Sequence, residues 1–152
     1  MQASLDIDLP PADRSLSTVE SLRDWLRITH DEVLSAIENG VIPVAFDLRT
    51  PGAERAEVRI WHPTVEALVR SRGRDSGPRL DADAVIARLV PEDVRSSALE
   101  TLWSLSHQHV WGLIDSGCLP VRRRPAAASG PLSFAVLHSD GIRAFLRQRV
   151  VI

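Results

Sequence analysis

The sequence predicts a mainly α-helical protein with short β strands, built from two tandem copies of one module. First, residues 28–44 (ITHDEVLSAIENGVIPV) and residues 105–121 (LSHQHVWGLIDSGCLPV) align without a gap at an offset of 77. Second, the offset continues downstream, where Arg70 aligns with Arg147. Third, each copy carries helix start and stop signals followed by a turn-rich loop. A fixed internal period of this kind sets the architecture of a chain. Six aligned pairs are identical: His30/His107, Val33/Val110, Ile37/Ile114, Gly40/Gly117, Pro43/Pro120 and Val44/Val121.

Length and composition predict a globular protein whose two halves depend on each other. The chain has 152 residues, so each copy has roughly 75, near the lower limit at which a hydrophobic core suffices. The single cysteine, Cys118, excludes an intrachain disulfide and a cysteine zinc cluster. The N-terminal residues lack the apolar run of a signal peptide, and no stretch approaches the ~18 apolar residues of a membrane span. We therefore expect a cytoplasmic protein with no membrane contact.

The two copies differ in charge. The whole chain has a net charge of −2. Residues 1–76 contain 9 Arg against 13 Asp and Glu, which gives −4, whereas residues 77–152 contain 9 Arg against 7, which gives +2. An asymmetry of this kind indicates a division of labour between the halves.

The central segment of each copy is predicted to be a capped helix. Thr29 is a good N-cap, and Glu32 three residues later completes a capping box. The second copy keeps the cap as Ser106. Each helix then ends at a glycine, Gly40 or Gly117, in the place where a left-handed residue is needed.

A shorter amphipathic helix is predicted immediately upstream of each capped helix. Apolar residues at helical spacing place it at residues 18–27 in the first copy and 97–104 in the second. Only about two residues separate it from the next helix, which is typical of a helix-turn-helix.

A β hairpin and a closing helix are predicted to follow. Residues 57–60 alternate polar and apolar side chains as a half-buried strand does, and residues 134–137 are their counterpart. Pro63 suits the first turn of the closing helix in the first copy. Ser139 with Asp140 is expected to cap that helix in the second copy.

The remaining segments connect the copies. Residues 73–78 are predicted to be a linker and residues 80–90 an extra helix, and Pro91 can start a helix that runs into the second copy. The predicted division is an N-terminal arm at 1–17, a first module at 18–74, a linker with a helix at 75–95 and a second module at 96–152.

The combination of helix, tight turn, capped helix, G-x-(I/L)-P, hairpin and final helix resembles a known family. Its features occupy residues 105–120 and 139–146 in the second copy, and residues 28–43 and 65–69 in the first. They resemble the excisionase-type winged helix, which is also the DNA-binding half of MerR-type regulators. The resemblance implies two tandem winged helix-turn-helix modules, in which the second helix enters the major groove and the wing contacts the DNA backbone or the minor groove.

The resemblance also implies which residues face DNA. The implied reading positions are His107, Gln108, Trp111 and Gly112 in the second copy, and His30, Asp31, Leu34 and Ser35 in the first. The implied wing contacts are Arg122, Arg123 and Arg124 in the second copy, and Arg49 in the loop of the first is a further candidate.

Two of these features have both a functional and a structural interpretation. Three clustered arginines at 122–124 can neutralise two or three phosphates, with a salt slope of about −2 to −3 in log K. They can equally form a solvated basic loop. Gln108 can pair with adenine, and His107 can contact guanine or a phosphate, but both can also be ordinary surface residues.

Metal binding and catalysis are not predicted. His107 and His109 are two residues apart, so they do not share a helix face. The chain has no nucleophile elbow, phosphate loop, zinc-protease helix or dinucleotide turn. We therefore expect no enzyme activity, no metal and no cofactor.

Three of the four tryptophans are predicted to lie in the core, because they fall on apolar faces: Trp25, Trp61 and Trp103. Trp111 falls on the outer part of the second helix, where it can pack against the wing or contact a partner.

Two functions follow from these features. The first is a double-stranded DNA-binding protein of phage or mobile-element type, either a transcriptional regulator or an excisionase-like accessory factor. The second is a degenerate winged-helix module for protein–protein interaction or assembly, favoured by Asp31, Glu32 and Glu38 in the first copy, which would repel phosphates. In a mixed arrangement, the second module binds DNA and the acidic first module binds a partner protein or another copy of the chain.

Overall fold

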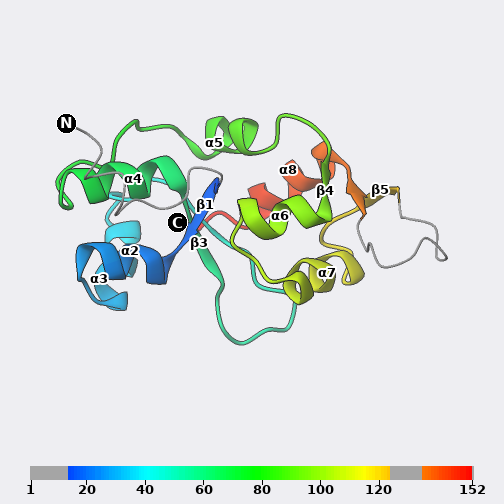
Figure 1. The fold of residues 1–152 in the computed structure, drawn as a ribbon, viewed down its shortest axis with the longest axis horizontal. Helices are drawn as coiled ribbons and strands as arrows, with labels where there is room; N and C mark the ends of the chain where they lie inside the picture. The colour runs from blue at the N-terminus through cyan, green and yellow to red at the C-terminus, as the bar shows by residue number, and fades with distance from the viewer. Residues whose placement is uncertain (1–13, 124–134, 152) are drawn as a thin grey trace.

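The computed structural model describes residues 14–123 and 135–151, which form a mixed α/β structure (Figure 1). Seven helices and two three-stranded antiparallel sheets lie within these residues, and roughly half of the described residues are helical. The strands are short, as the sequence predicts. Each sheet nevertheless has one strand more than a hairpin, so the class is mixed rather than mainly α.

The first half combines one sheet with three helices. Its elements are β1 (Leu16–Thr18), α2 (Val19–Leu26), α3 (His30–Glu38), β2 (Ala45–Asp47), β3 (Val58–Trp61) and α4 (His62–Arg70). The sheet order is β1-β3-β2, with both pairings antiparallel. α2 packs against both α3 and α4.

The second half begins after a connecting helix. The elements are α5 (Ala82–Leu89), β4 (Val94–Arg95), α6 (Ser96–Leu102), α7 (His107–Asp115), β5 (Val121–Arg123), β6 (Val136–Leu137) and α8 (Ser139–Gln148). The sheet order is β4-β6-β5. After α5, the order of helices and of strands within the sheet is the same as in the first half, and α3 and α7 begin and end 77 residues apart.

The turn between the paired helices has the same backbone conformation in both halves. Arg27 and Ser104, which are 77 residues apart, both have φ 55°. The left-handed conformation costs a non-glycine residue about 1–2 kcal/mol. Hydrogen bonds that close the preceding helix offset this cost, since the N–H of Ile28 donates to Arg23 and the N–H of Leu105 to Glu100, at 3.2 and 3.1 Å. The predicted tight turn between two helices is therefore confirmed in each half.

The predicted start signals of α3 and α7 are also confirmed. The Thr29 hydroxyl accepts the N–H of Glu32, and the Glu32 carboxylate accepts the N–H of Thr29, both at 3.1 Å. Ser106 caps α7 through its hydroxyl. Gly40 and Gly117 follow the two helices with φ of 78° and 85°, a region that favours glycine.

The sequence does not predict the two strands that precede α2 and α6. β1 lies in the segment predicted to be an N-terminal arm, where Ser17 pairs with Ile60 of β3. β4 lies where the sequence predicts a helix starting at Pro91, and that prediction is wrong. Strands of two or three residues show no alternation pattern, so only their pairing partner reveals them.

α8 begins differently from the prediction. Ser139 and Asp140 lie inside its first turn rather than capping it. The N-cap is His138, whose Nδ1 accepts the N–H of Asp140 at 3.2 Å, and the carboxylate of Asp93 accepts the N–H of Ser139 at 2.8 Å. The contact from Asp93 is tertiary, so neighbouring residues in the sequence could not indicate it. For α4, the prediction of Pro63 in the first turn is confirmed.

The buried residues of one hydrophobic cluster all come from the first half, whereas the other cluster, here called the shared core, spans both halves. The shared core contains Leu16, Val44, Phe46, Leu48 and Trp61 from the first half. These side chains pack with buried residues of α5, α6, α7 and α8, including the fully buried Trp103. The two halves thus share buried side chains, and the predicted core positions of Trp61 and Trp103 are confirmed. Trp25 is partly buried against the cluster of the first half.

The last described residues complete the contact between the halves. The N–H of Asp47 donates to the carbonyl of Arg149, and the N–H of Val151 donates to the carbonyl of Ala45, both at 2.8 Å. Phe46 and Val150 form an antiparallel bridge. The end of the second half therefore extends the first sheet along the free edge of β2.

The connection between the halves contains α5, which lies within the predicted helix at residues 80–90. Asp81 caps it, since its carboxylate accepts the N–H of Ala84 at 2.8 Å.

Across the described ranges of the chain, none of the helices has both the length and the apolar character needed to cross a bilayer.

Candidate nucleic-acid interface

The first turn of α7 presents two of the predicted reading residues. His107 and Gln108 are both exposed. The Nδ1 of His107 donates to Oε2 of Glu100 on α6 at 3.0 Å, with the His107 side chain 55% exposed. The rings of His107 and Trp111 lie 6.2 Å apart between centroids. His107 and Gln108 are thus both solvent-exposed at the N-terminus of α7.

The middle of α7 contacts the first half. The Nε2 of His109 donates to the carbonyl of Leu48. A Cβ on Gly112 would lie 3.1 Å from Cγ2 of Thr50, so the helix approaches the loop after β2 closely at this point. Trp111 is half-buried and packs against the shared core. Two of the four predicted reading positions on α7, Trp111 and Gly112, thus contact protein.

Arg49, the candidate DNA contact of the first half, is held within its own loop. Its Nε and Nη2 both lie 2.8 Å from Oδ2 of Asp47, and its Nη1 donates to the carbonyls of Ala53 and Glu54 at 3.4 Å. The same Asp47 carboxylate accepts the N–H of Glu57 across the loop. Arg49 therefore organises the loop between β2 and β3, and its charge is largely balanced there.

The pKa of Asp47 reflects these contacts. Burial raises the pKa of this carboxyl, but the hydrogen bond from the Arg49 side chain, the backbone N–H groups of Glu57 and Arg49, and the charge of Arg49 together outweigh burial. The pKa of Asp47 consequently lies below its ordinary value, and the loop is held by an ionised carboxylate.

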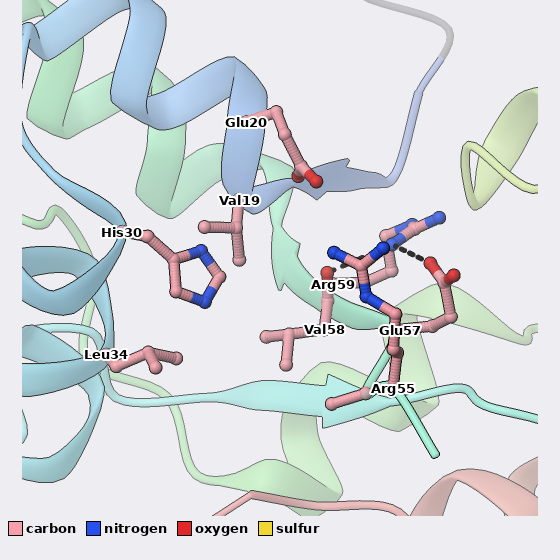
Figure 2. Close-up of a pocket in the computed structure, with 9 residues that line it drawn as sticks. Val19, Glu20, His30, Leu34, Arg55, Glu57, Val58 and Arg59 are labelled. Atoms are coloured by element: carbon pink, nitrogen blue, oxygen red, sulfur yellow. Dashed lines mark hydrogen bonds and ion pairs between the residues drawn. The ribbon is translucent and has the colours of Figure 1, made fainter. Parts of the chain in front are cut away.

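Two of the four predicted reading positions of α3, His30 and Leu34, line a cavity of about 260 Å³ against β3 (Figure 2). The ring of His30 points into this cavity, and Leu34 forms its floor beside Val58. Arg55 and Glu57 approach from the other side, out of the loop that leads into β3. The cavity that His30 lines is thus bordered by cationic and anionic side chains together, which is a mixed surface rather than a phosphate site.

Ser35 lies on the exposed surface of α3, as the sequence predicts for a reading residue. The other exposed side chains of this helix are mainly acidic: Asp31, Glu32 and Glu38. The exposed surface of α3 therefore carries negative charge.

Arg59 is a buried residue at the contact between the halves that the sequence does not single out. Its Nε donates to the carbonyl of Trp103 at 3.1 Å, and its Nη2 donates to that of Ser104 at 2.9 Å. Burial lowers the pKa of Arg59, and the nearby carboxylate of Glu57, at 3.3 Å, opposes this effect. The alternating pattern of residues 57–60 assigns Arg59 to a polar, solvent-facing position, whereas the second half covers that position.

The predicted arginine cluster follows α7 along the chain. Arg122 and Arg123 lie in β5, and Arg124 lies outside the described residues. β5 pairs with β6, with an irregularity between Val121 and Arg123. The cluster thus belongs to the hairpin of the same half that exposes His107 and Gln108.

Comparison of this chain with protein-family models, with curated proteins and with solved structures finds no match. In the described parts of the chain, no group of three or more His, Cys, Asp or Glu side chains is placed to hold a metal ion.

Proposed function

We propose that the chain is a double-stranded DNA-binding protein built from two tandem winged helix-turn-helix modules, of which the second contacts DNA. The observation that carries this proposal is the exposed N-terminus of α7, with His107 and Gln108 on its surface and the arginine-bearing β5 in the same half. The order of helices and strands and the left-handed turn residues Arg27 and Ser104 support the winged-helix interpretation of both halves.

The first turn of α7 supplies the chemistry for groove binding. The N–H groups at a helix N-terminus and the helix dipole attract a phosphate. Gln108 can donate to and accept from an adenine edge, and His107 can donate to guanine or phosphate. Arg122 and Arg123 would add sequence-independent contacts to the backbone. In this role the protein would serve as a transcriptional regulator or an excisionase-like accessory factor.

The first module has a different part in this proposal. Its exposed helix surface is acidic at Asp31, Glu32 and Glu38, and its loop arginine, Arg49, is paired with Asp47. Its loop supports α7 instead, through the contact of His109 with Leu48. In this proposal, the first module therefore supports α7 through contacts with the side of the helix that faces the protein.

The test is binding of the full chain to random duplex DNA, followed by fluorescence polarisation at increasing salt. We expect wild type to bind with a log–log salt slope of about −2 to −3 contributed by the cluster. Arg122→Ala/Arg123→Ala/Arg124→Ala should lose binding. The matched control removes three exposed arginines elsewhere, as Arg74→Ala/Arg79→Ala/Arg88→Ala. Equal loss in both variants would show only a dependence on net charge.

The second candidate is a protein–protein interaction module, and the acidic surface of α3 favours it. In that case wild type would not bind duplex DNA even at low salt. Size-exclusion chromatography would then show self-association, which Asp31→Arg/Glu38→Arg would disrupt.

A further inference from the structure

An apolar groove lies on the first half, away from its contact with the second. It encloses about 210 Å³ between α2, α3, the turn after α3 and the end of α4. Its apolar lining includes Leu22, Leu26, Ile28, Val41, Ile42 and Leu68. Val41 is 42% exposed, and no other large apolar side chain of the described residues is as exposed. The exposed Arg72 stands at the rim.

The corresponding surface of the second half is covered. The residues 77 positions after five of the lining residues are Leu99, Trp103, Leu105, Leu119 and Phe145. All five are buried in the shared core, together with Phe46 and Leu48 of the first half. One half therefore buries this surface against a neighbouring segment, and the other half leaves it open.

Residues 46–48, which cover this surface of the second half, are extended. Their backbone is bound by an arginine at the edge of the covered surface. Arg149, the counterpart of Arg72, donates from Nη1 to the carbonyls of Asp47 and Arg49 at 3.2 and 2.6 Å. The apolar residues of this segment, Phe46 and Leu48, are separated by one aspartate. The surface of the second half thus accepts an extended segment with the pattern apolar-Asp-apolar. Arg149 binds backbone carbonyl groups in and directly after this segment.

Residues 5–9 (LDIDL) carry the same pattern. Leu5, Ile7 and Leu9 alternate with two aspartates, so one face of an extended segment would be apolar and the other acidic. The acidic face would complement Arg72 at the rim. The residues of the second half that correspond to Phe46 and Leu48 are Arg123 and Pro125, so this apolar pattern is not repeated there. This difference argues against a dimer in which the second half of another copy covers the groove in the way that residues 46–48 cover the second half.

The chain can reach the groove from its first described residues. Ser15 accepts the N–H of His62 at the start of α4, at 2.9 Å, and the groove lies at the other end of α4. A nine-residue helix is ~13 Å long. Residues 9–15 in an extended conformation span about 20 Å. The segment at residues 5–9 is therefore within reach of the groove of its own chain.

We propose that residues 5–9 dock into the groove of the first half of the same chain, as residues 46–48 cover the equivalent surface of the second half. The segment would bury the exposed side chain of Val41 and place Asp6 or Asp8 near Arg72. This docking does not depend on the proposed DNA binding, and either can fail without the other.

Disulfide trapping in the full chain tests the docking. Ile7→Cys/Val41→Cys is made in a Cys118→Ser background and oxidised at low protein concentration. A disulfide requires the two Cα atoms to approach within about 7 Å. The control pairs Ile7→Cys with Asp115→Cys, an exposed position on α7. We expect at least about fivefold more intrachain disulfide in the Val41 pair, because docking raises the local concentration of the two thiols.

Two outcomes would overturn the docking. Disulfide formation no faster than in the control would show that the segment does not occupy the groove, and a disulfide-linked dimer would assign the groove to a second copy. Hydrogen exchange provides a check that needs no cysteine. Compared with wild type, Ile7→Asp should speed exchange in residues 36–42, whereas the matched change Gln2→Asp should not. Unchanged exchange in Ile7→Asp would also contradict the docking.

Discussion

Arg59 links the two halves through its guanidinium group. The side chain starts on β3 and ends at the turn between α6 and α7, where it binds two main-chain carbonyls. These carbonyls lie at the C-terminal end of α6, where a helix leaves acceptors unpaired and favours a cation. One side chain from the first half therefore binds the carbonyl groups at the C-terminal end of α6, in the turn that leads into α7.

Replacement of Arg59 should destabilise the protein more than replacement of a neighbouring exposed arginine. Arg59→Met keeps the length of the side chain but leaves the carbonyls of Trp103 and Ser104 without this donor. We expect a loss of about 2–3 kcal/mol in the free energy of unfolding, measured by urea denaturation. Arg55→Met, at an exposed position in the loop before β3, should stay within about 0.5 kcal/mol of wild type. Equal effects of the two changes would refute the role of Arg59.

The Asp47 carboxylate gives the loop between β2 and β3 a dependence on pH. The pKa of Asp47 is lowered in the folded protein from an ordinary value near 3.8. Its contribution to stability is therefore fully present above that value and is lost as pH falls through the folded pKa. We expect the stability difference between wild type and Asp47→Asn to be constant from pH 5 to 7 and to shrink below about pH 4. A difference that grows on acidification would contradict this assignment.

At the scale of elements, the helices could be predicted more fully than the strands. α3 and α7 have local signals, because Thr29 and Ser106 cap them and Gly40 and Gly117 follow them. β1 and β4 are too short to show a pattern, and the cap of α8 comes from the distant Asp93. The exposed turn of the candidate site, with His107 and Gln108, could be predicted from the repeat. The contacts that Trp111 and Gly112 make with other parts of the protein could not be predicted, because they depend on how one half packs against the other.

Gly141 allows α8 to pack closely against Pro120, which follows α7 along the chain. A Cβ on Gly141 would overlap Cγ of Pro120, whose ring cannot move aside. Helix propensity alone would make Gly141→Ala stabilising by about 1 kcal/mol. We expect instead a destabilisation of about 2 kcal/mol from the steric clash, measured by thermal unfolding. Gly112→Ala, which meets only the Thr50 methyl group at 3.1 Å, should have a smaller effect. A Gly141→Ala variant as stable as wild type would contradict this packing.

At the scale of the whole molecule, the halves pack head to tail. Phe46 of β2 and Leu48 just after it belong to the same buried cluster as residues of α6, α7 and α8, and Val150 near the C-terminus pairs with Phe46 in return. The surface of the second half that corresponds to β2 does not repeat this contact. The shared core thus joins the two halves, beside the separate hydrophobic cluster of the first half.

A shared core predicts a single unfolding transition. Trp103 and Trp61 report on the shared core by fluorescence, and far-UV circular dichroism reports on helices of both halves. We expect the two signals to give the same midpoint in urea, because loss of one half exposes the core of the other. Two separated transitions would show that the halves are independent domains.

The most direct test of the central claim exchanges one pair of equivalent residues. Gln108 on α7 and Asp31 on α3 are 77 positions apart, and both are exposed. Binding to duplex DNA at low salt would be measured by fluorescence polarisation for Gln108→Asp and for Asp31→Gln. We predict that Gln108→Asp weakens binding by about tenfold or more, since it puts a carboxylate against DNA, and that Asp31→Gln leaves binding within about twofold of wild type. Wild-type affinity in Gln108→Asp would contradict DNA binding through α7.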